Sequence, residues 1–176
     1  MTLALGDPLP PFALPGVDGS QTTTEGLEGP VVVAFWCNHC PYVRAWEDRL
    51  NAIAADYAGR ATVIAVNAND ADAYPADGFP EMRERAREKA FGFAYAHDES
   101  QALARRFGAE RTPEVFLFDG DGALRYHGAI DDSTDAAGVR ATYLRDALDA
   151  VSAGAAPGVA TTPAVGCTIK WRRGAG

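Results

Sequence analysis

Two cysteines separated by two residues are the strongest chemical signal in this chain. They are Cys37 and Cys40, in the segment 36–41, which reads Trp-Cys-Asn-His-Cys-Pro. The apolar run 31–35 precedes this segment and apolar residues at helical spacing follow it, so a strand is predicted to deliver both thiols to the first turn of a helix. The free N–H groups and the dipole of a helix N-terminus favour a thiolate over a thiol. This arrangement predicts thiol–disulfide chemistry.

Two further residues could take part in that chemistry. His39 lies between the two cysteines, where an imidazolium would stabilise a thiolate, lower its pKa and make a disulfide more oxidising. Cys167 lies in a C-terminal tail, after the Gly-, Pro-, Thr- and Ala-rich stretch 154–166. Three interpretations of Cys167 stay open: a resolving thiol that folds back onto the pair, an intermolecular disulfide, or a packed cysteine that never reacts.

Composition is that of an ordinary globular protein. The chain has 176 residues, of which 47% are hydrophobic and 23% charged, enough for one domain with a sizeable core. A net charge of -8 argues against nucleic-acid binding, because no basic stripe is available to neutralise phosphates. Neither a signal peptide nor a membrane-spanning apolar segment is visible, so we expect a cytoplasmic protein with no membrane partner. Cysteines in a reducing compartment are more often catalytic or metal-binding than structural.

The order of the predicted elements is that of an α/β protein with a mixed sheet. In the first half of the chain, we expect a strand over 31–35, a helix over 40–57, a strand over 61–67 and a loop over 68–80. A charged and solvated helix over 81–90, a short strand over 93–96 and a helix over 100–107 capped by Ser100 should follow. The last predicted elements are a hairpin of 115–118 with 123–127 and a final helix with one apolar face, formed by Val139, Leu144, Leu148 and Val151. The β-α-β start implies parallel central strands, and the late hairpin adds antiparallel ones.

The two ends of the chain differ in composition from its centre. Residues 1–30 are rich in Pro and Gly, which predicts a short edge hairpin or an extended arm. We therefore expect one domain over 1–153, with an N-terminal extension over 1–30. A flexible tail over 154–176 would carry Cys167.

Several motifs together resemble the thioredoxin fold. The Cys-x-x-Cys ends the first core strand, and Arg111-Thr112-Pro113 resembles the cis-proline loop that thioredoxin-like proteins place against the redox pair. The opening GDPLPPFALP resembles the start of the peroxiredoxin (AhpC/TSA) and TlpA/ResA branch. The segments WCNHCPYV, NANDADAYPADGFP and GCTIKW narrow the resemblance to a peroxiredoxin-like subfamily with a Cys-x-x-Cys motif. The resemblance implies an α/β thioredoxin-like fold, in which helices flank a central mixed sheet.

The resemblance also implies a role for each site residue. Cys37 would be the exposed, attacking thiolate, and Cys40 the deeper, resolving thiol. Thr112 and Pro113 would shape the docking surface, because the residue before the proline offers backbone hydrogen bonds to an incoming peptide or thiol. Trp36 is interpreted as a wall of the substrate groove. The predicted substrate-binding residues are Trp36, His39, Arg111, Thr112 and Pro113.

One departure from thioredoxin affects proton transfer. Thioredoxin has a buried acid six residues before its first cysteine, and this chain has Val31 there. The acid–base role must then fall to His39, Glu47, Glu114 or water. The partners implied are protein or small-molecule thiols and disulfides and an external dithiol reductant; no bound cofactor or metal is expected.

A thiol peroxidase is the alternative within redox chemistry. In the alignment that the resemblance suggests, Cys40 holds the peroxidatic position and Cys37 replaces the threonine that would hold the peroxide. Arg111 corresponds only approximately to the arginine of the peroxidases. Peroxides would then be substrates, in an antioxidant role, although the missing hydroxyl argues against efficient turnover.

A redox-sensing or metal-binding interaction protein is the alternative from another class. It would use the pair together with His39 or Cys167, yet no second Cys-x-x-Cys or histidine pair lies at zinc spacing. His97 and His127 are interpreted as ordinary surface or hairpin residues. The acids of the loop over 68–80 lack the pattern of a calcium loop, so we expect a solvated insertion. These acids are Asp70, Asp72 and Asp77.

Overall fold

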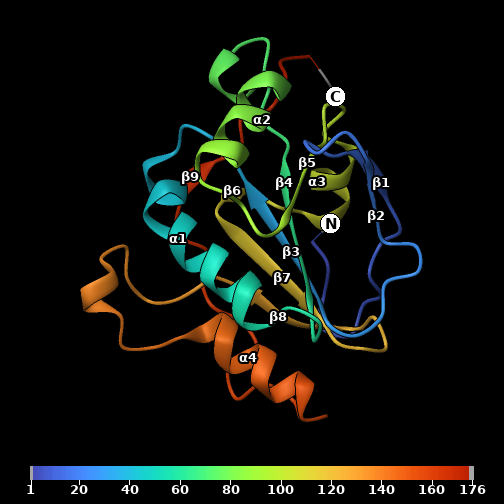
Figure 1. Ribbon diagram of the computed structural model, residues 1–176. Helices are drawn as coiled ribbons and strands as arrows, with labels where there is room; N and C mark the ends of the chain where they lie inside the picture. The colour runs from blue at the N-terminus through green and yellow to red at the C-terminus, as the bar shows by residue number, and fades with distance from the viewer. Residues whose placement is uncertain (1, 175–176) are drawn as a thin grey trace.

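A mixed five-stranded sheet forms the centre of the protein. The structure, a computed structural model, describes residues 2–174. The strands lie in the order β5-β4-β3-β7-β8 (Figure 1), with bounds Ala94–His97 (β5), Thr62–Asn67 (β4), Val31–Trp36 (β3), Glu114–Phe118 (β7) and Leu124–Gly128 (β8). Parallel pairing joins β3 to β4 and β4 to β5, whereas antiparallel pairing joins β3 to β7 and β7 to β8. The predicted α/β fold with a mixed sheet is confirmed.

Helices cover both faces of this sheet, which explains why β3 is buried along its whole length. Alternate residues of β3 enter two separate apolar clusters, because successive side chains of a strand point to opposite faces. One cluster packs against α1 (Pro41–Asp56), α2 (Phe79–Glu88) and α4 (Tyr143–Ser152), and the other against α3 (Ala102–Phe107). Figure 1 shows α1 in front of the sheet and α3 behind it.

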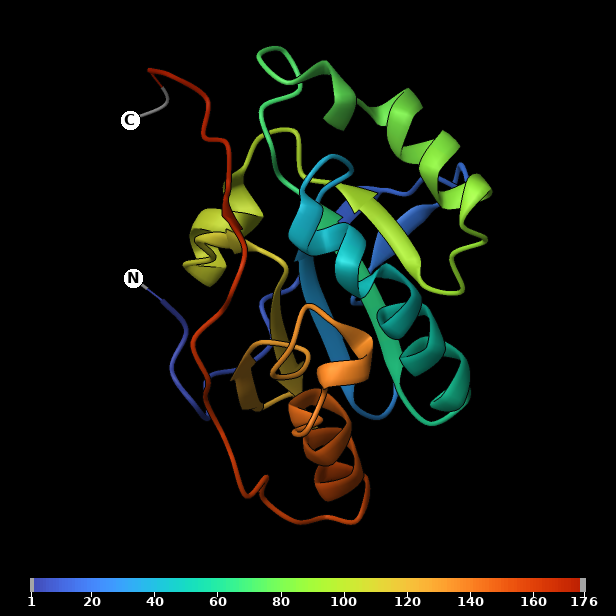
Figure 2. The ribbon, with the colours of Figure 1, turned by 90° about the vertical axis from the view of Figure 1, so that its left-hand side faces the viewer.

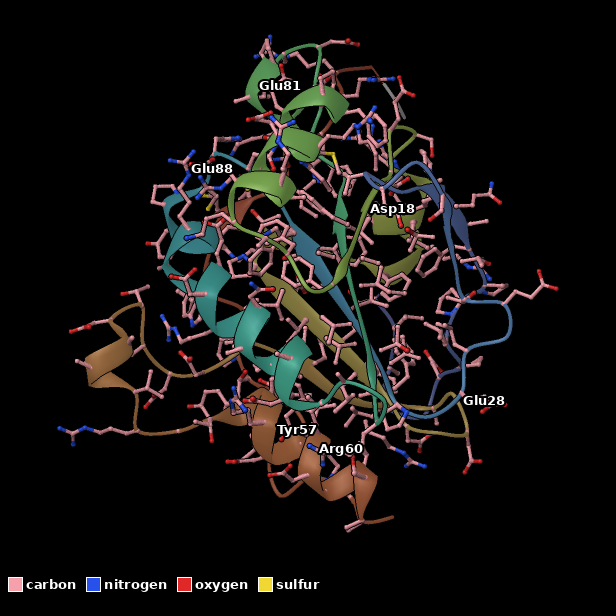
Figure 3. The ribbon with its side chains drawn as sticks, in the orientation of Figure 1. Asp18, Glu28, Tyr57, Arg60, Glu81 and Glu88 are labelled. Atoms are coloured by element: carbon pink, nitrogen blue, oxygen red, sulfur yellow. The ribbon has the colours of Figure 1, made fainter. Side chains whose placement is uncertain are left out.

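Helix α1 is the main element behind the redox pair. Its apolar residues recur at helical spacing on the face that packs on the sheet: Val43, Trp46, Leu50 and Ile53. At its far end, the Tyr57 hydroxyl donates to Asp149 Oδ1 at 2.5 Å and so joins α1 to α4. The Arg60 guanidinium lies over the Tyr57 ring, 4.8 Å from its centroid (Figure 3). The apolar face and the Tyr57–Asp149 hydrogen bond together hold α1 against the sheet and against α4.

The N-terminal extension contains the predicted edge hairpin. Strands β1 (Ala13–Pro15) and β2 (Gln21–Thr23) pair antiparallel and lie beside β5 (Figure 1). The Val17 amide donates to the Tyr95 carbonyl at 2.9 Å, which attaches the hairpin to that edge of the sheet. In the part of the chain covered by residues 2–174, no helix is both long and apolar enough to cross a membrane.

The tail, residues 154–174, lies along the domain rather than away from it. Figure 2 shows it as an extended run down the whole flank of the molecule. The Thr162 amide donates to the His127 carbonyl at 3.0 Å, and the side chain of Ile169 is buried. Cys167–Thr168 form strand β9, which pairs antiparallel with β6 (Arg111–Thr112). The tail predicted to be flexible is thus held by backbone pairing and burial, while the division after residue 153 stays a prediction.

The start of α3 differs from its prediction. The residue before the helix is Gln101, with a left-handed φ of 62°, so Ser100 is not the N-cap. A carboxylate oxygen of Asp98 accepts the Ala104 amide at 2.9 Å and caps the first turn from a more distant position. The final helix also begins later than predicted, at Tyr143.

Candidate active site

Strand β3 and helix α1 place the two cysteines at their junction, as the sequence predicts. Cys40 is the N-cap residue of α1, and Pro41 follows as the first helical residue. Both thiols are buried, with exposed fractions of 1% for Cys37 and 0% for Cys40. The expectation that Cys37 is the exposed cysteine is therefore wrong for this structure, because the tail and the loop after β4 cover the end of the sheet.

The third cysteine joins the pair. Cys167 Sγ lies 2.7 Å from Cys40 Sγ, and the β6–β9 register sets Cys167 opposite Thr112. The Thr112–Pro113 peptide bond is cis, as the resemblance to the thioredoxin loop predicts. Cys37 Sγ lies 3.4 Å from the Thr112 hydroxyl, and Cys40 Sγ lies 3.5 Å from the Thr112 carbonyl oxygen. All three sulfurs thus gather around one residue of the cis-proline loop.

Hydrogen bonding lowers the pKa of Cys40 and raises that of Cys37, the reverse of the roles that the resemblance implies. A hydrogen bond from Cys37 lowers the pKa of Cys40 to about 4, against the effect of burial, and further hydrogen bonds from the Cys167 thiol and from the Val43 and Cys167 amides add to this. The same Cys37–Cys40 hydrogen bond and burial raise the pKa of Cys37, and the negative charge of Asp77 adds to the rise. Burial and the contact with Cys40 raise the pKa of Cys167 to about 11. The lowered pKa therefore belongs to the cysteine at the helix N-cap, where the helix dipole also favours a thiolate.

Asp77 is a site residue that the sequence reasoning missed. It ends a short 3-10 helix, η1 (Pro75–Asp77), and its exposed fraction is 0%. Its carboxylate accepts the Asn38 amide at 2.7 Å, Asn67 Nδ2 at 3.2 Å and Asn69 Nδ2 at 2.9 Å. The other contact is with His39 Nδ1. The loop predicted to be a solvated insertion is thus folded inwards.

A weak signal for Asp77 exists in the sequence. Asn67 is the last residue of the core strand β4 and Asn69 lies two residues further on, and the carboxyl ends of parallel strands meet at one edge of the sheet. Two amide side chains beside the redox pair need an acceptor there, since buried polar groups are hydrogen-bonded. Nothing in the spacing distinguishes Asp77 from Asp70 or Asp72 as that acceptor, so only the structure identifies it.

The two glutamates proposed as acid–base groups are engaged elsewhere. Glu47 accepts two hydrogen bonds from the Arg85 guanidinium, at 2.5 and 2.8 Å. Glu114 accepts the Arg111 amide at 2.9 Å and lies 2.6 Å from His127 Nε2. Glu47 therefore joins α1 to α2, and Glu114 supports the cis-proline loop. The acid that the structure places beside Cys37 is Asp77 instead.

The residues predicted to bind substrate differ in where the structure places them. Trp36 is fully buried and packs edge-on against Phe93, so its interpretation as a groove wall is wrong: the β3 side chain faces the core. Arg111 binds the tail, since its guanidinium donates to the Gly166 carbonyl at 3.0 Å. His39 is partly exposed and stacks on Tyr74 at a centroid distance of 5.8 Å.

The two histidines interpreted as ordinary residues are both packed. His97 is buried and stacks on Phe79 at 5.9 Å, and this burial lowers its pKa. The His127 ring stacks on Phe116 at 4.2 Å and is the partner of Glu114 described above. A surface position is therefore wrong for His97, and His127 has a structural partner.

One group of side chains has the composition of a metal site. Cys37, His39 and Asp77 each offer a ligand atom, and these atoms lie within 4.8 Å of one another. Sulfur, imidazole nitrogen and carboxylate oxygen are all zinc ligands. In this arrangement, however, Cys37 bonds to Cys40, and His39 and Asp77 contact each other.

Solved structures with a similar fold span almost the whole chain. An uncharacterized conserved protein from Geobacillus kaustophilus has a TM-score of 0.91 and 37% identity, over 98% of this chain and 94% of that one. A hypothetical protein from Sinorhizobium meliloti 1021 has a TM-score of 0.92 and 36% identity, over 99% and 98%. A thioredoxin-like protein in the oxidized form has a TM-score of 0.72 at 23% identity, over 87% and 99%, which shows a shared thioredoxin-like fold.

Comparison of the sequence with known proteins identifies the family of the chain. The thiol:disulfide interchange protein DsbE of Escherichia coli (strain K12) is 30% identical over 138 residues, which cover 72% of this chain. The chain spans 66% of the length of that relative. Residues 5–127 match the AhpC/TSA family, as the resemblance of the opening segment predicts. Because that match covers well over half of the sequence, the chain belongs to the AhpC/TSA family.

Proposed function

We propose that the chain is a thiol–disulfide oxidoreductase in which Cys40 supplies the attacking thiolate. The observation that carries the proposal is the position of Cys40 at the N-cap of α1, where its pKa falls to about 4 and a second thiol bonds to it. A low thiol pKa at a helix N-terminus is typical of reactive cysteines. The DsbE relative, named as a thiol:disulfide interchange protein, supports the same chemistry.

The reaction follows from this charge distribution. The Cys40 thiolate attacks one sulfur of a substrate disulfide, forms a mixed disulfide and releases the other sulfur as a thiol. Cys37 then loses its proton and attacks Cys40, which closes the Cys37–Cys40 disulfide and releases the reduced substrate. Asp77 and His39 are the polar groups beside Cys37 that would accept this proton. An external dithiol returns the pair to the reduced state.

Insulin reduction by dithiothreitol tests this function. The variant Cys40→Ser should lose catalysis, because it removes the thiolate, and Cys37→Ser should turn over slowly, because the Cys37–Cys40 disulfide can no longer close. Circular dichroism verifies that both variants fold. If Cys40→Ser reduces insulin as fast as the unmodified protein, the assignment is wrong.

A thiol peroxidase is the second candidate. It is supported by the family and by the thiolate at Cys40, the position that the resemblance gives to the peroxidatic cysteine. Against it, Cys37 replaces the peroxide-binding threonine, and Arg111 bonds to the tail. Peroxide consumption coupled to dithiothreitol distinguishes the two: a rate comparable to insulin reduction, lost in Cys40→Ser, would favour the peroxidase and an antioxidant role.

The proposal also covers the substrates and the cellular compartment. We propose thiols and disulfides of proteins or small molecules as substrates. We also propose a reducing compartment such as the cytoplasm, where cysteines are more often catalytic than structural. The metal-binding alternative rests on Cys37, His39 and Asp77. Zinc bound stoichiometrically by the purified reduced protein, and lost in Cys37→Ser, would favour that alternative.

A further inference from the structure

Strand β9 brings Cys167 to the redox pair by backbone pairing. Its register with β6 pairs Thr112 with Cys167 and Arg111 with Thr168. Because opposite residues of an antiparallel pair lie side by side, this register alone sets Cys167 beside the cis-proline loop. The result is the 2.7 Å approach of Cys167 Sγ to Cys40 Sγ.

The chain is anchored on both sides of Cys167. Before it, the Arg111 guanidinium donates to the Gly166 carbonyl at 3.0 Å. After it, the Ile169 amide donates to the Glu110 carbonyl at 2.9 Å, and the Ile169 side chain is buried. The Lys170 amide donates to Asn69 Oδ1 at 2.9 Å. Contacts on both sides hold the sulfur in place, so its approach to Cys40 is a built feature of the fold.

The three thiols differ in access to solvent. Cys37 and Cys40 are buried, whereas Cys167 is partly exposed. A substrate that reaches Cys40 must therefore displace β9 from the edge of β6. An extended segment with a cysteine would then occupy the position that Cys167 occupies here, with backbone hydrogen bonds to the same edge.

We propose that Cys167 is a third catalytic cysteine, which resolves the mixed disulfide on Cys40 when β9 returns to the edge of β6. The proposal rests on the oxidoreductase function above and deepens it. In the step, the Cys167 sulfur attacks the Cys40 sulfur of the Cys40–substrate disulfide. The Cys40–Cys167 disulfide forms, the substrate sulfur leaves, and the proton of Cys167 goes to that leaving thiolate.

The two resolving cysteines then act in series. Cys37 attacks the Cys40 sulfur of the Cys40–Cys167 disulfide, forms the Cys37–Cys40 disulfide and returns the thiol to Cys167. One disulfide is broken and one is formed, so the exchange does not change the oxidation state of the protein. An external dithiol afterwards reduces the Cys37–Cys40 disulfide.

The first experiment isolates Cys167 from Cys37. Reduced full-length Cys37→Ser is treated with a limiting amount of dithiobis(nitrobenzoic acid), a disulfide whose two halves absorb when released. Resolution by Cys167 releases both halves and leaves a Cys40–Cys167 cross-linked peptide after non-reducing digestion. In Cys37→Ser/Cys167→Ser, only one half is released and the other stays on Cys40.

The outcomes separate this proposal from the function on which it rests. A nitrobenzoate adduct that persists on Cys40 in Cys37→Ser, with no cross-linked peptide, overturns the resolving role while Cys40 remains the attacking thiolate. No adduct on Cys40 in the double variant means that the proposed function itself fails. An adduct on Cys40 in the double variant, together with the cross-link in Cys37→Ser, supports both. A first adduct on Cys167 in Cys37→Ser would reverse the order of attack and overturn the resolving role.

The second experiment perturbs the strand and leaves the sulfurs intact. A methyl group at position 166 would lie 2.1 Å from the Thr112 carbonyl oxygen, so Gly166→Ala must shift β9. Gly158→Ala is the matched control in the same tail, because an added methyl group there meets nothing within 4 Å. In the Cys37→Ser background, Gly166→Ala should slow the release of the second half by about tenfold or more. Equal rates in both glycine variants would contradict the proposal.

Discussion

Cys40 owes its low pKa to groups that could each be removed separately. The largest contribution is the hydrogen bond from Cys37, and the Cys167 thiol and two backbone amides add to it. The thiolate is thus a property of the three-cysteine cluster as much as of the helix N-terminus. The sequence indicates the helix and its dipole, but it cannot show which of two cysteines near a helix start keeps its proton.

The ionisation of Cys40 can be followed by the ultraviolet absorbance of the thiolate. The difference in absorbance between the reduced protein and Cys40→Ser should persist as the pH falls and disappear only near about 4. Cys37→Ser should move this midpoint upwards, because it removes the thiol that contributes most to the low pKa of Cys40. A midpoint in the ordinary thiol range for the unmodified reduced protein would refute the assignment.

Asp77 combines a structural and an electrostatic effect. Asp77→Asn should destabilise the fold by roughly 1–3 kcal/mol, because a buried acceptor of three amide hydrogen bonds becomes in part a donor. It should also lower the pKa of Cys37, since the carboxylate charge contributes to the rise. Urea unfolding and thiol titration measure the two effects. Asp72→Asn, at an exposed carboxylate of the same loop, should change neither.

At the level of elements, β9 is the part of the site that sequence patterns describe least. The core strands follow from unbroken apolar runs and α1 from apolar residues at helical spacing, which is why their predicted bounds agree closely with the structure. The tail has no such pattern: its pairing with β6 depends on the shape of a loop more than fifty residues earlier in the chain. For the same reason, the inward fold of η1 around Asp77 could not be predicted.

Ile169 is the apolar anchor of β9. Ile169→Ala should weaken the attachment of the tail and raise the rate at which external disulfides react with Cys40. The reason is that β9, which covers the Cys40 sulfur, would separate from β6 more often. The loss of stability should be modest if the tail unfolds locally, and up to about 2–5 kcal/mol if it does not. Stopped-flow reaction of the Cys37→Ser background with dithiobis(nitrobenzoic acid) measures the rate. Val165→Ala, at an exposed position of the same tail, should leave the rate unchanged.

On the scale of the whole molecule, the tail closes the sheet end that a thioredoxin-like fold uses for chemistry. It starts after α4, passes along the flank of β8 and reaches the N-terminus of α1 (Figure 2). The sequence predicts the fold because the Cys-x-x-Cys, the cis-proline loop and the apolar strands each specify local structure. Closure of the site depends instead on long-range packing of polar segments, and no periodicity encodes it.

Stability of the reduced protein should therefore depend on pH through Cys40. Between its folded pKa of about 4 and the ordinary thiol range, Cys40 binds no proton in the folded state and binds one in the unfolded state. Since the unfolded state binds more protons, the free energy of unfolding rises with pH in this window, by at most about 1.4 kcal/mol per pH unit. The stabilisation is fully present above the unfolded pKa and is lost as the pH falls through the folded one. The raised pKa values of Cys37 and Cys167 act with the opposite sign, above the ordinary thiol range.

Comparison with Cys40→Ser isolates this effect from the many carboxylates that titrate in the same window. Urea unfolding of both reduced proteins at pH 5, 6, 7 and 8 should give a difference in unfolding free energy that grows steadily with pH in favour of the unmodified protein. Oxidation should abolish the trend, because a cysteine in a disulfide has no proton to lose. Parallel pH profiles for the two reduced proteins would mean that the charge does not reside on Cys40, and that the site needs a different attacking thiol.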